Sequence, residues 1–130
     1  NTADMGVILC YLGQSEESVS WFRRARQIDP YFDPPWYWHG LGLAHLLLRH
    51  YDEAATNFER ASARPCQMSA YLAGCHARLG ANGRARELAA ECMARKPDFN
   101  VSRWMAKMPF RNPDDAAHLS ECLRAAGLPE

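Results

Sequence analysis

Thiol and imidazole side chains are the groups in this chain that could bind a metal ion. Cys75 and His76 are adjacent, and Cys92 could join them to complete a set of sulfur and nitrogen ligands of the kind that zinc prefers. His39 and His45 could form a second set, but they are six residues apart, which places them on different faces of a helix. Whether these side chains bind a metal ion or pack in the core depends on the secondary structure that carries them.

Patterns typical of catalysis are missing from the sequence. It has no G-x-S-x-G nucleophile elbow, no glycine-rich phosphate loop and no H-E-x-x-H zinc motif. We therefore expect no enzymatic activity and assign no catalytic residue.

The stretch WFRRAR, residues 21–26, mixes aromatic and basic side chains, a mixture also found on nucleic-acid-binding surfaces. The whole chain, however, has fifteen basic and fifteen acidic residues and so lacks the basic excess that phosphate binding needs. We expect Arg23, Arg24 and Arg26 on a solvated helix face, and no nucleic-acid partner.

Three stretches share a spacing of small, large and small residues. They read SEESVSWFRRA (15–25), YDEAATNFERA (51–61) and NGRARELAAEC (82–92). The aligned positions are Ser18, Phe22 and Ala25 in the first, Ala54, Phe58 and Ala61 in the second, and Ala85, Ala89 and Cys92 in the third. Their offsets of 36 and 31 residues indicate an internal repeat.

Each stretch follows a segment that pairs a large apolar residue with a small one. The pairs are Met5–Gly6, Leu41–Gly42 and Leu72–Ala73. This pattern predicts units of two short helices joined by a tight turn, with the small residues letting the helices approach closely. Pro30, Pro65 and Pro97 are expected to end the units, since proline cannot continue a helix.

The pattern resembles the tetratricopeptide repeat, whose signature is W-x2-L-G-x2-Y, then A-x3-F, then P. The second unit carries most of the likeness, with Trp38, Leu41, Gly42, Ala54, Phe58 and Ala61. The resemblance implies an all-α fold, an α-α superhelix of about three stacked helix hairpins in a single domain, 1–130. Its parts are a truncated first repeat (1–32), a second (35–65), a third (66–97) and two C-terminal capping helices (98–130).

The C-terminal residues do not repeat again. NVSRWMAKM (100–108) predicts a short helix, and Asn112, Pro113 and Gly127 are suited to the cap, first position and end of a last helix. Residues 109–130 also resemble the closing segment of bacterial signalling proteins, in which these repeats follow a class III adenylate or guanylate cyclase domain or a DNA-binding domain.

The alignment favours packing roles for the candidate metal ligands. Cys92 stands where the other units have Ala25 and Ala61, and His45 and His76 stand at the tyrosine position of the family pattern. We therefore expect no metal and no cofactor. The five cysteines lack C-x-x-C spacing, which favours reduced thiols and a cytoplasmic protein.

In the family, the first helix of each repeat lines a concave groove that binds partner segments. The corresponding residues here are Val7, Tyr11, Trp36, His39, Leu43, Leu46, Leu47, Gln67, Ala70 and Arg78. They are mostly apolar, with Arg78 as the one cation, so a clamp for a terminal carboxylate is not expected. Residues 35–47 are hydrophobic nearly all round, and this leaves two alternatives: burial within the stack, or contact with a partner or a second copy.

The linker DPYFDPPWYW (29–38) leaves a similar choice. Its aromatic residues Tyr31, Phe32, Trp36 and Tyr37 could fill a gap between the first two units or anchor a partner.

We interpret the chain as a protein–protein interaction scaffold that binds a protein, a peptide or a second copy, and as a C-terminal module of a larger bacterial signalling protein. The alternative is a regulatory module that controls an attached nucleotidyl cyclase or DNA-binding output domain. No window approaches 18 apolar residues, so no membrane contact is expected.

Overall fold

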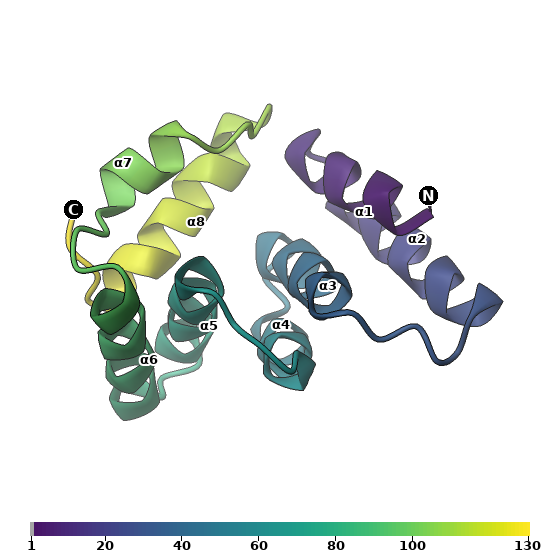
Figure 1. The fold of residues 1–130 in the computed structure, drawn as a ribbon. Coiled ribbons are helices and arrows are strands. Elements are labelled where there is room, and N and C mark those ends of the chain that lie inside the picture. Colours follow the sequence, from purple (N-terminus) through teal and green to yellow (C-terminus); the bar gives the residue numbers. More distant parts are fainter. Residues whose placement is uncertain (1) are drawn as a thin grey trace.

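The computed structural model describes residues 2–130, with side chains from Met5 onward. Asn1, where the first predicted repeat begins, lies outside the described residues. Over the described range the chain forms helices and no strand (Figure 1), so the prediction of an all-α fold is confirmed. The helices are α1 (Thr2–Tyr11), α2 (Ser15–Ile28), α3 (Pro35–Leu47), α4 (Tyr51–Arg60), α5 (Cys66–Arg78), α6 (Asn82–Arg95), α7 (Val101–Ala106) and α8 (Pro113–Ala125).

The first six helices form three pairs joined by tight turns of one type. Each turn places one residue in the left-handed region: Gly13 at φ 80°, Arg49 at φ 64° and Gly80 at φ 82°. The next residue then donates its N–H to a carbonyl near the end of the first helix, as His50 does to His45 at 2.9 Å. This hydrogen bond closes the helix C-terminus. Arg49 adopts at a cost the conformation that glycine adopts freely.

The large residues of the repeat lie between the helices. Phe22 and Phe58 are fully buried. A Cβ at Gly6 would lie 2.8 Å from the ring of Phe22, and one at Gly42 would lie 2.8 Å from the ring of Phe58. Only a glycine therefore lets the two helices of these pairs approach so closely.

The pairs pack in chain order. α3 contacts α1 and α2 of the preceding pair, and α5 contacts α3 and α4. The first helices α1, α3 and α5 thus follow one another, and a single hydrophobic core extends from Cys10 to Leu128.

The last two helices break this succession. α8 packs on α5 and touches α3, and α7 packs on α8 (Figure 1). α8 begins with Asn112 as its N-cap, whose side chain accepts a hydrogen bond from the N–H of Asp114 at 2.9 Å. Leu119, Cys122 and Leu123 form its fully buried face, so α8 covers α5 and a smaller part of α3.

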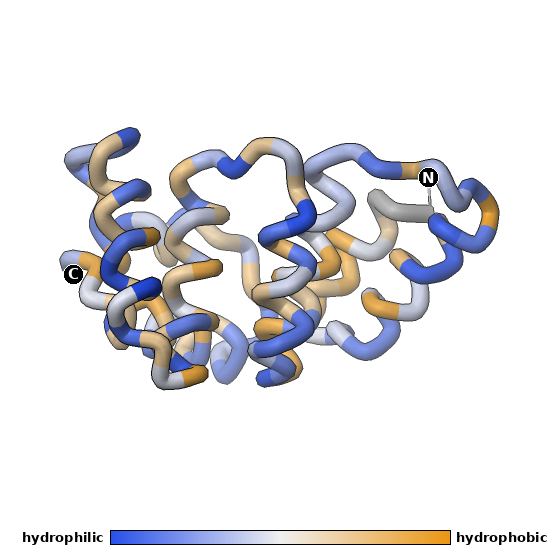
Figure 2. The backbone as a smooth tube through the Cα atoms, turned by 90° about the horizontal axis from the view of Figure 1, so that it is seen from below, coloured by the Kyte–Doolittle hydropathy of each residue, from blue (hydrophilic) through white to orange (hydrophobic). Residues whose placement is uncertain are grey.

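Figure 2 shows hydrophilic and hydrophobic residues mixed along the chain. Among the described residues, no helix combines the length and the apolar character that spanning a membrane requires.

Candidate partner-binding surface

The ten groove positions predicted from the repeat differ widely in exposure. His39, Leu43, Leu46, Leu47 and Ala70 are buried, Val7, Tyr11 and Gln67 are half-buried, and Trp36 and Arg78 are exposed. The hydrophobic helix α3 is thus covered nearly all round, by α1, α2, α4, α5 and α8. For all of these α3 positions except Trp36, burial within the fold is the alternative that the structure supports.

The C-terminal cap covers much of the predicted groove on α5. Cys122 of α8 lies so close to Gly74 that a Cβ there would be 3.1 Å from the Cβ of Cys122. Arg78 forms an ion pair with Glu121 of α8 at 3.5 Å. The indole N–H of Trp104 in α7 donates to the Tyr71 hydroxyl at 3.0 Å. The one cation of the predicted groove is therefore paired within the chain.

The loop between α7 and α8 reaches as far as α1. The N–H of Arg111 donates to the carbonyl of Tyr11 at 2.8 Å, and the rings of Tyr11 and Phe110 lie 5.2 Å apart. Sequence reasoning missed this crossing. The repeat carries no signal for it, because residues 98–130 do not repeat the pattern.

An open edge remains at the start of α3. Trp36 is 40% exposed, and Val7 of α1 and Gln67 of α5 retain partial exposure. We call Val7, Trp36 and Gln67 the open edge. These residues come from three successive first helices, α1, α3 and α5.

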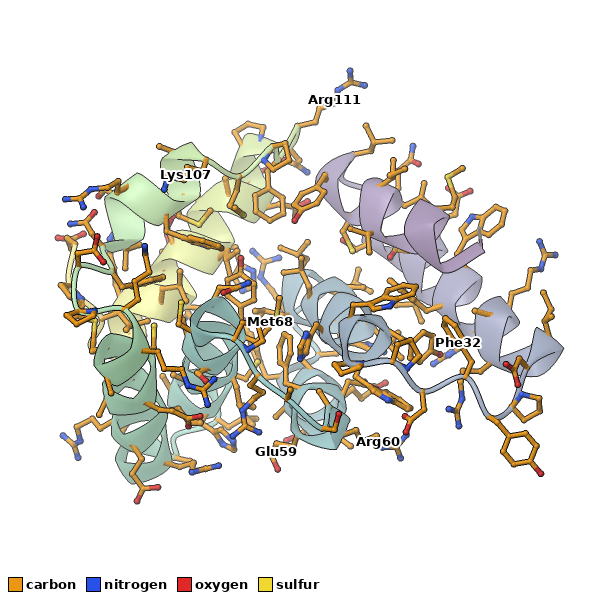
Figure 3. The ribbon with its side chains drawn as sticks, viewed as in Figure 1. Phe32, Glu59, Arg60, Met68, Lys107 and Arg111 are labelled. Atoms are coloured by element: carbon orange, nitrogen blue, oxygen red, sulfur yellow. The ribbon has the colours of Figure 1, made fainter. Side chains whose placement is uncertain are left out.

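The aromatic side chains of the linker pack against one another, except that of Tyr31. Phe32, labelled in Figure 3, lies beside the start of α3. Its ring stands edge-on to Trp36 and to Tyr37, with 5.6 Å between centroids in each pair. Tyr37 is buried, and its hydroxyl donates to the carbonyl of Phe22 at 2.9 Å. Tyr31, in contrast, is 92% exposed and fills no gap.

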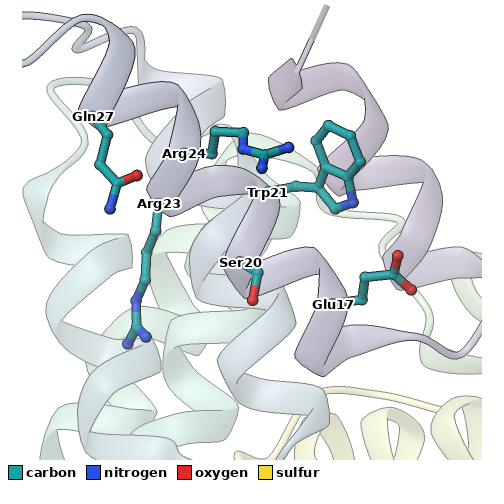
Figure 4. Close-up of a pocket in the computed structure, with 6 residues that line it drawn as sticks. All are labelled: Glu17, Ser20, Trp21, Arg23, Arg24 and Gln27. Atoms are coloured by element: carbon teal, nitrogen blue, oxygen red, sulfur yellow. The ribbon is translucent and has the colours of Figure 1, made fainter.

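The arginines of α2 divide between two environments. Arg23 and Arg24 are exposed, as predicted. With Trp21 and neighbouring polar residues they line a shallow depression of about 500 Å³ on this one helix (Figure 4). Arg26 differs from the prediction, because it is half-buried, lies 5.2 Å from the Trp38 ring and donates to the carbonyl of Phe32 at 2.5 Å.

The thiols do not converge on a metal site. Cys10, Cys75, Cys92 and Cys122 are buried and Cys66 is half-buried, all as free thiols. Burial raises the pKa of Cys10 to about 11 and that of Cys92 to about 12. Buried thiols of this kind are unreactive and act as small apolar side chains.

Among the described side chains, neither candidate ligand set comes together: not Cys75, His76 and Cys92, and not His39 and His45. His39 hydrogen-bonds the carbonyl of Ala63 at 2.9 Å, and His76 pairs with Glu59 at 3.0 Å. Among the side chains described from Met5 onward, a different group brings three ligand atoms together: His45, His50 and Glu53.

Neither the protein-family models nor the curated proteins contain a match to this chain.

Proposed function

We propose that the chain is a tetratricopeptide-like scaffold that binds a protein partner through the open edge. The observation that carries the proposal is the exposure of Trp36, whose neighbours Tyr37 and Trp38 are buried. Tryptophan is enriched among the residues that dominate binding energy at protein interfaces. The resemblance of residues 109–130 to signalling proteins supports a place for this module in such a protein.

The chemistry of the edge favours an apolar partner segment. Trp36 and Val7 provide apolar surface, and Gln67 provides an amide that can donate and accept hydrogen bonds. Arg78 is already paired with Glu121, so recognition of a terminal carboxylate at this position is disfavoured. We expect a helical or extended segment that places a large apolar side chain against Trp36.

Site-specific photo-cross-linking in the source cells tests the proposal. A benzophenone amino acid replaces Trp36 in one variant and Tyr31 in a matched control, because Tyr31 is 92% exposed but lies in the linker. We expect a discrete adduct from position 36 that is lost when Val7→Glu is added, and no such adduct from position 31. The same adducts from both positions, or none from position 36, would refute binding at the open edge.

The mass of the adduct also shows whether the partner is a second copy of the chain or a different protein. An adduct of twice the mass of the chain indicates self-association, and sedimentation of the wild type and Trp36→Ala then measures its strength.

A further inference from the structure

The turn between α3 and α4 brings together three side chains that can bind a metal ion. His45 lies in the last turn of α3, His50 immediately precedes α4, and Glu53 lies in the first turn of α4. Each offers one ligand atom within 4.8 Å of the other two. The Nδ1 atoms of the two histidines are 3.3 Å apart, and the second ring nitrogen of His45, Nε2, is 3.6 Å from the carboxylate of Glu53.

This convergence is specific to the second helix pair. At the corresponding places the first pair has Leu9, Gln14 and Glu17, and the third has His76, Ala81 and Arg84. The second pair is also the one whose turn contains Arg49 rather than glycine at positive φ. A non-glycine residue held in this region costs free energy and is found most often at functional sites.

The separation of the nitrogens matches shared coordination. Zinc binds histidine nitrogen at about 2.0–2.1 Å, and two such bonds at a tetrahedral angle place the nitrogens about 3.3–3.4 Å apart. Without a bound ion, the same separation lets the two rings share an N–H···N hydrogen bond. We propose that His45, His50 and Glu53 bind a divalent transition metal ion of the zinc class at this turn, with water as a fourth ligand.

The surroundings suit this role. His45 is buried, which fixes its ring. His50 and Glu53 are exposed, Glu53 with 57% of its side chain accessible. The ion can therefore enter from solvent.

Cobalt(II) spectroscopy on the untagged chain tests the site, because tetrahedral cobalt substituted for zinc gives visible absorption bands. We expect saturable binding of one Co²⁺ per chain, displacement by Zn²⁺ and an increase in Tm with Zn²⁺ concentration. His50→Ala and Glu53→Gln should each weaken binding at least tenfold, the lower bound set by the loss of a supporting residue.

The matched control is His76→Ala, which removes a histidine–glutamate pair of similar geometry that has no third ligand. It should leave Co²⁺ binding unchanged. Because His50 and Glu53 are exposed, circular dichroism should show both variants folded. The proposal is wrong if no saturable binding occurs up to millimolar Co²⁺, if binding is equally weakened by His76→Ala, or if either His50→Ala or Glu53→Gln leaves the affinity unchanged.

Discussion

Gly40 is the position where a single added methyl group tests the packing most directly. A Cβ at Gly40 of α3 would lie 2.5 Å from Cζ of Phe22, and a Cβ at Gly6 of α1 would lie 2.8 Å from the same ring. The ring is fully buried and also stands edge-on to Tyr37, with 5.5 Å between centroids. Because Phe22 is confined on both sides, it cannot move away from an alanine at position 40.

The expected loss of folding stability in Gly40→Ala is the difference between two opposing effects. Overpacking a well-packed core costs about 1–3 kcal/mol, whereas replacing glycine by alanine inside a helix contributes about 0.5–1 kcal/mol of stability. Since the ring has no direction in which to relax, we take the upper part of the first range. Gly40→Ala should lower the free energy of unfolding by about 1–2 kcal/mol.

Urea denaturation followed by circular dichroism measures this change, with the slope m expected to stay constant. Gly83→Ala is the matched control, because a Cβ at Gly83 in α6 meets no atom within 4 Å; it should be neutral or stabilise the chain by up to about 1 kcal/mol. In a Phe22→Leu background the penalty of Gly40→Ala should shrink. A Gly40→Ala chain as stable as the wild type, or a penalty unchanged by Phe22→Leu, would refute the argument.

Three further outcomes can be measured on the same chain. With a thiol reagent at neutral pH, Cys66 should react first and the four buried cysteines only after denaturation. Burial lowers the pKa of His118 and leaves its Nδ1 without a hydrogen-bond partner. The unfolded chain therefore binds more protons, so stability should fall as pH drops below about 6.5, and less steeply in His118→Gln, as denaturation midpoints will show. Asn112→Ala removes the N-cap of α8 and should cost about 1 kcal/mol in urea denaturation.

The helix pairs were predictable because their information is local. The spacing of Ser18, Phe22 and Ala25, repeated twice more, places large and small residues on one face of each second helix, and the structure buries Phe22 and Phe58 completely. Glycine at 13 and 80 marked two of the three turns. The third turn has no such mark, since Arg49 adopts positive φ without the residue type that indicates it.

The contacts that cross the chain were not predictable in the same way. His50 comes within 3.3 Å of His45 only because Arg49 turns the backbone, so the sequence spacing alone did not join these two histidines. The path of α8 depends on the contact between Gly74 and Cys122, and neither residue belongs to a repeating pattern at that contact. The repeat predicts which residues face the groove, but not that the same chain covers them.

The buried face of α8 limits where a partner could bind, because displacing α8 would cost free energy. To reach the covered part of the groove, a partner would have to displace α8, which exposes Leu119 and Leu123, both fully buried. Burial of a leucine side chain is worth about 1.5–3 kcal/mol, so these two residues alone oppose displacement by about 3–6 kcal/mol. A micromolar complex has a binding free energy of about −8.2 kcal/mol, of which such a displacement would offset about a third to three quarters. Binding at Val7, Trp36 and Gln67 avoids this cost, and for that reason the proposed partner site is the open edge rather than the whole concave face.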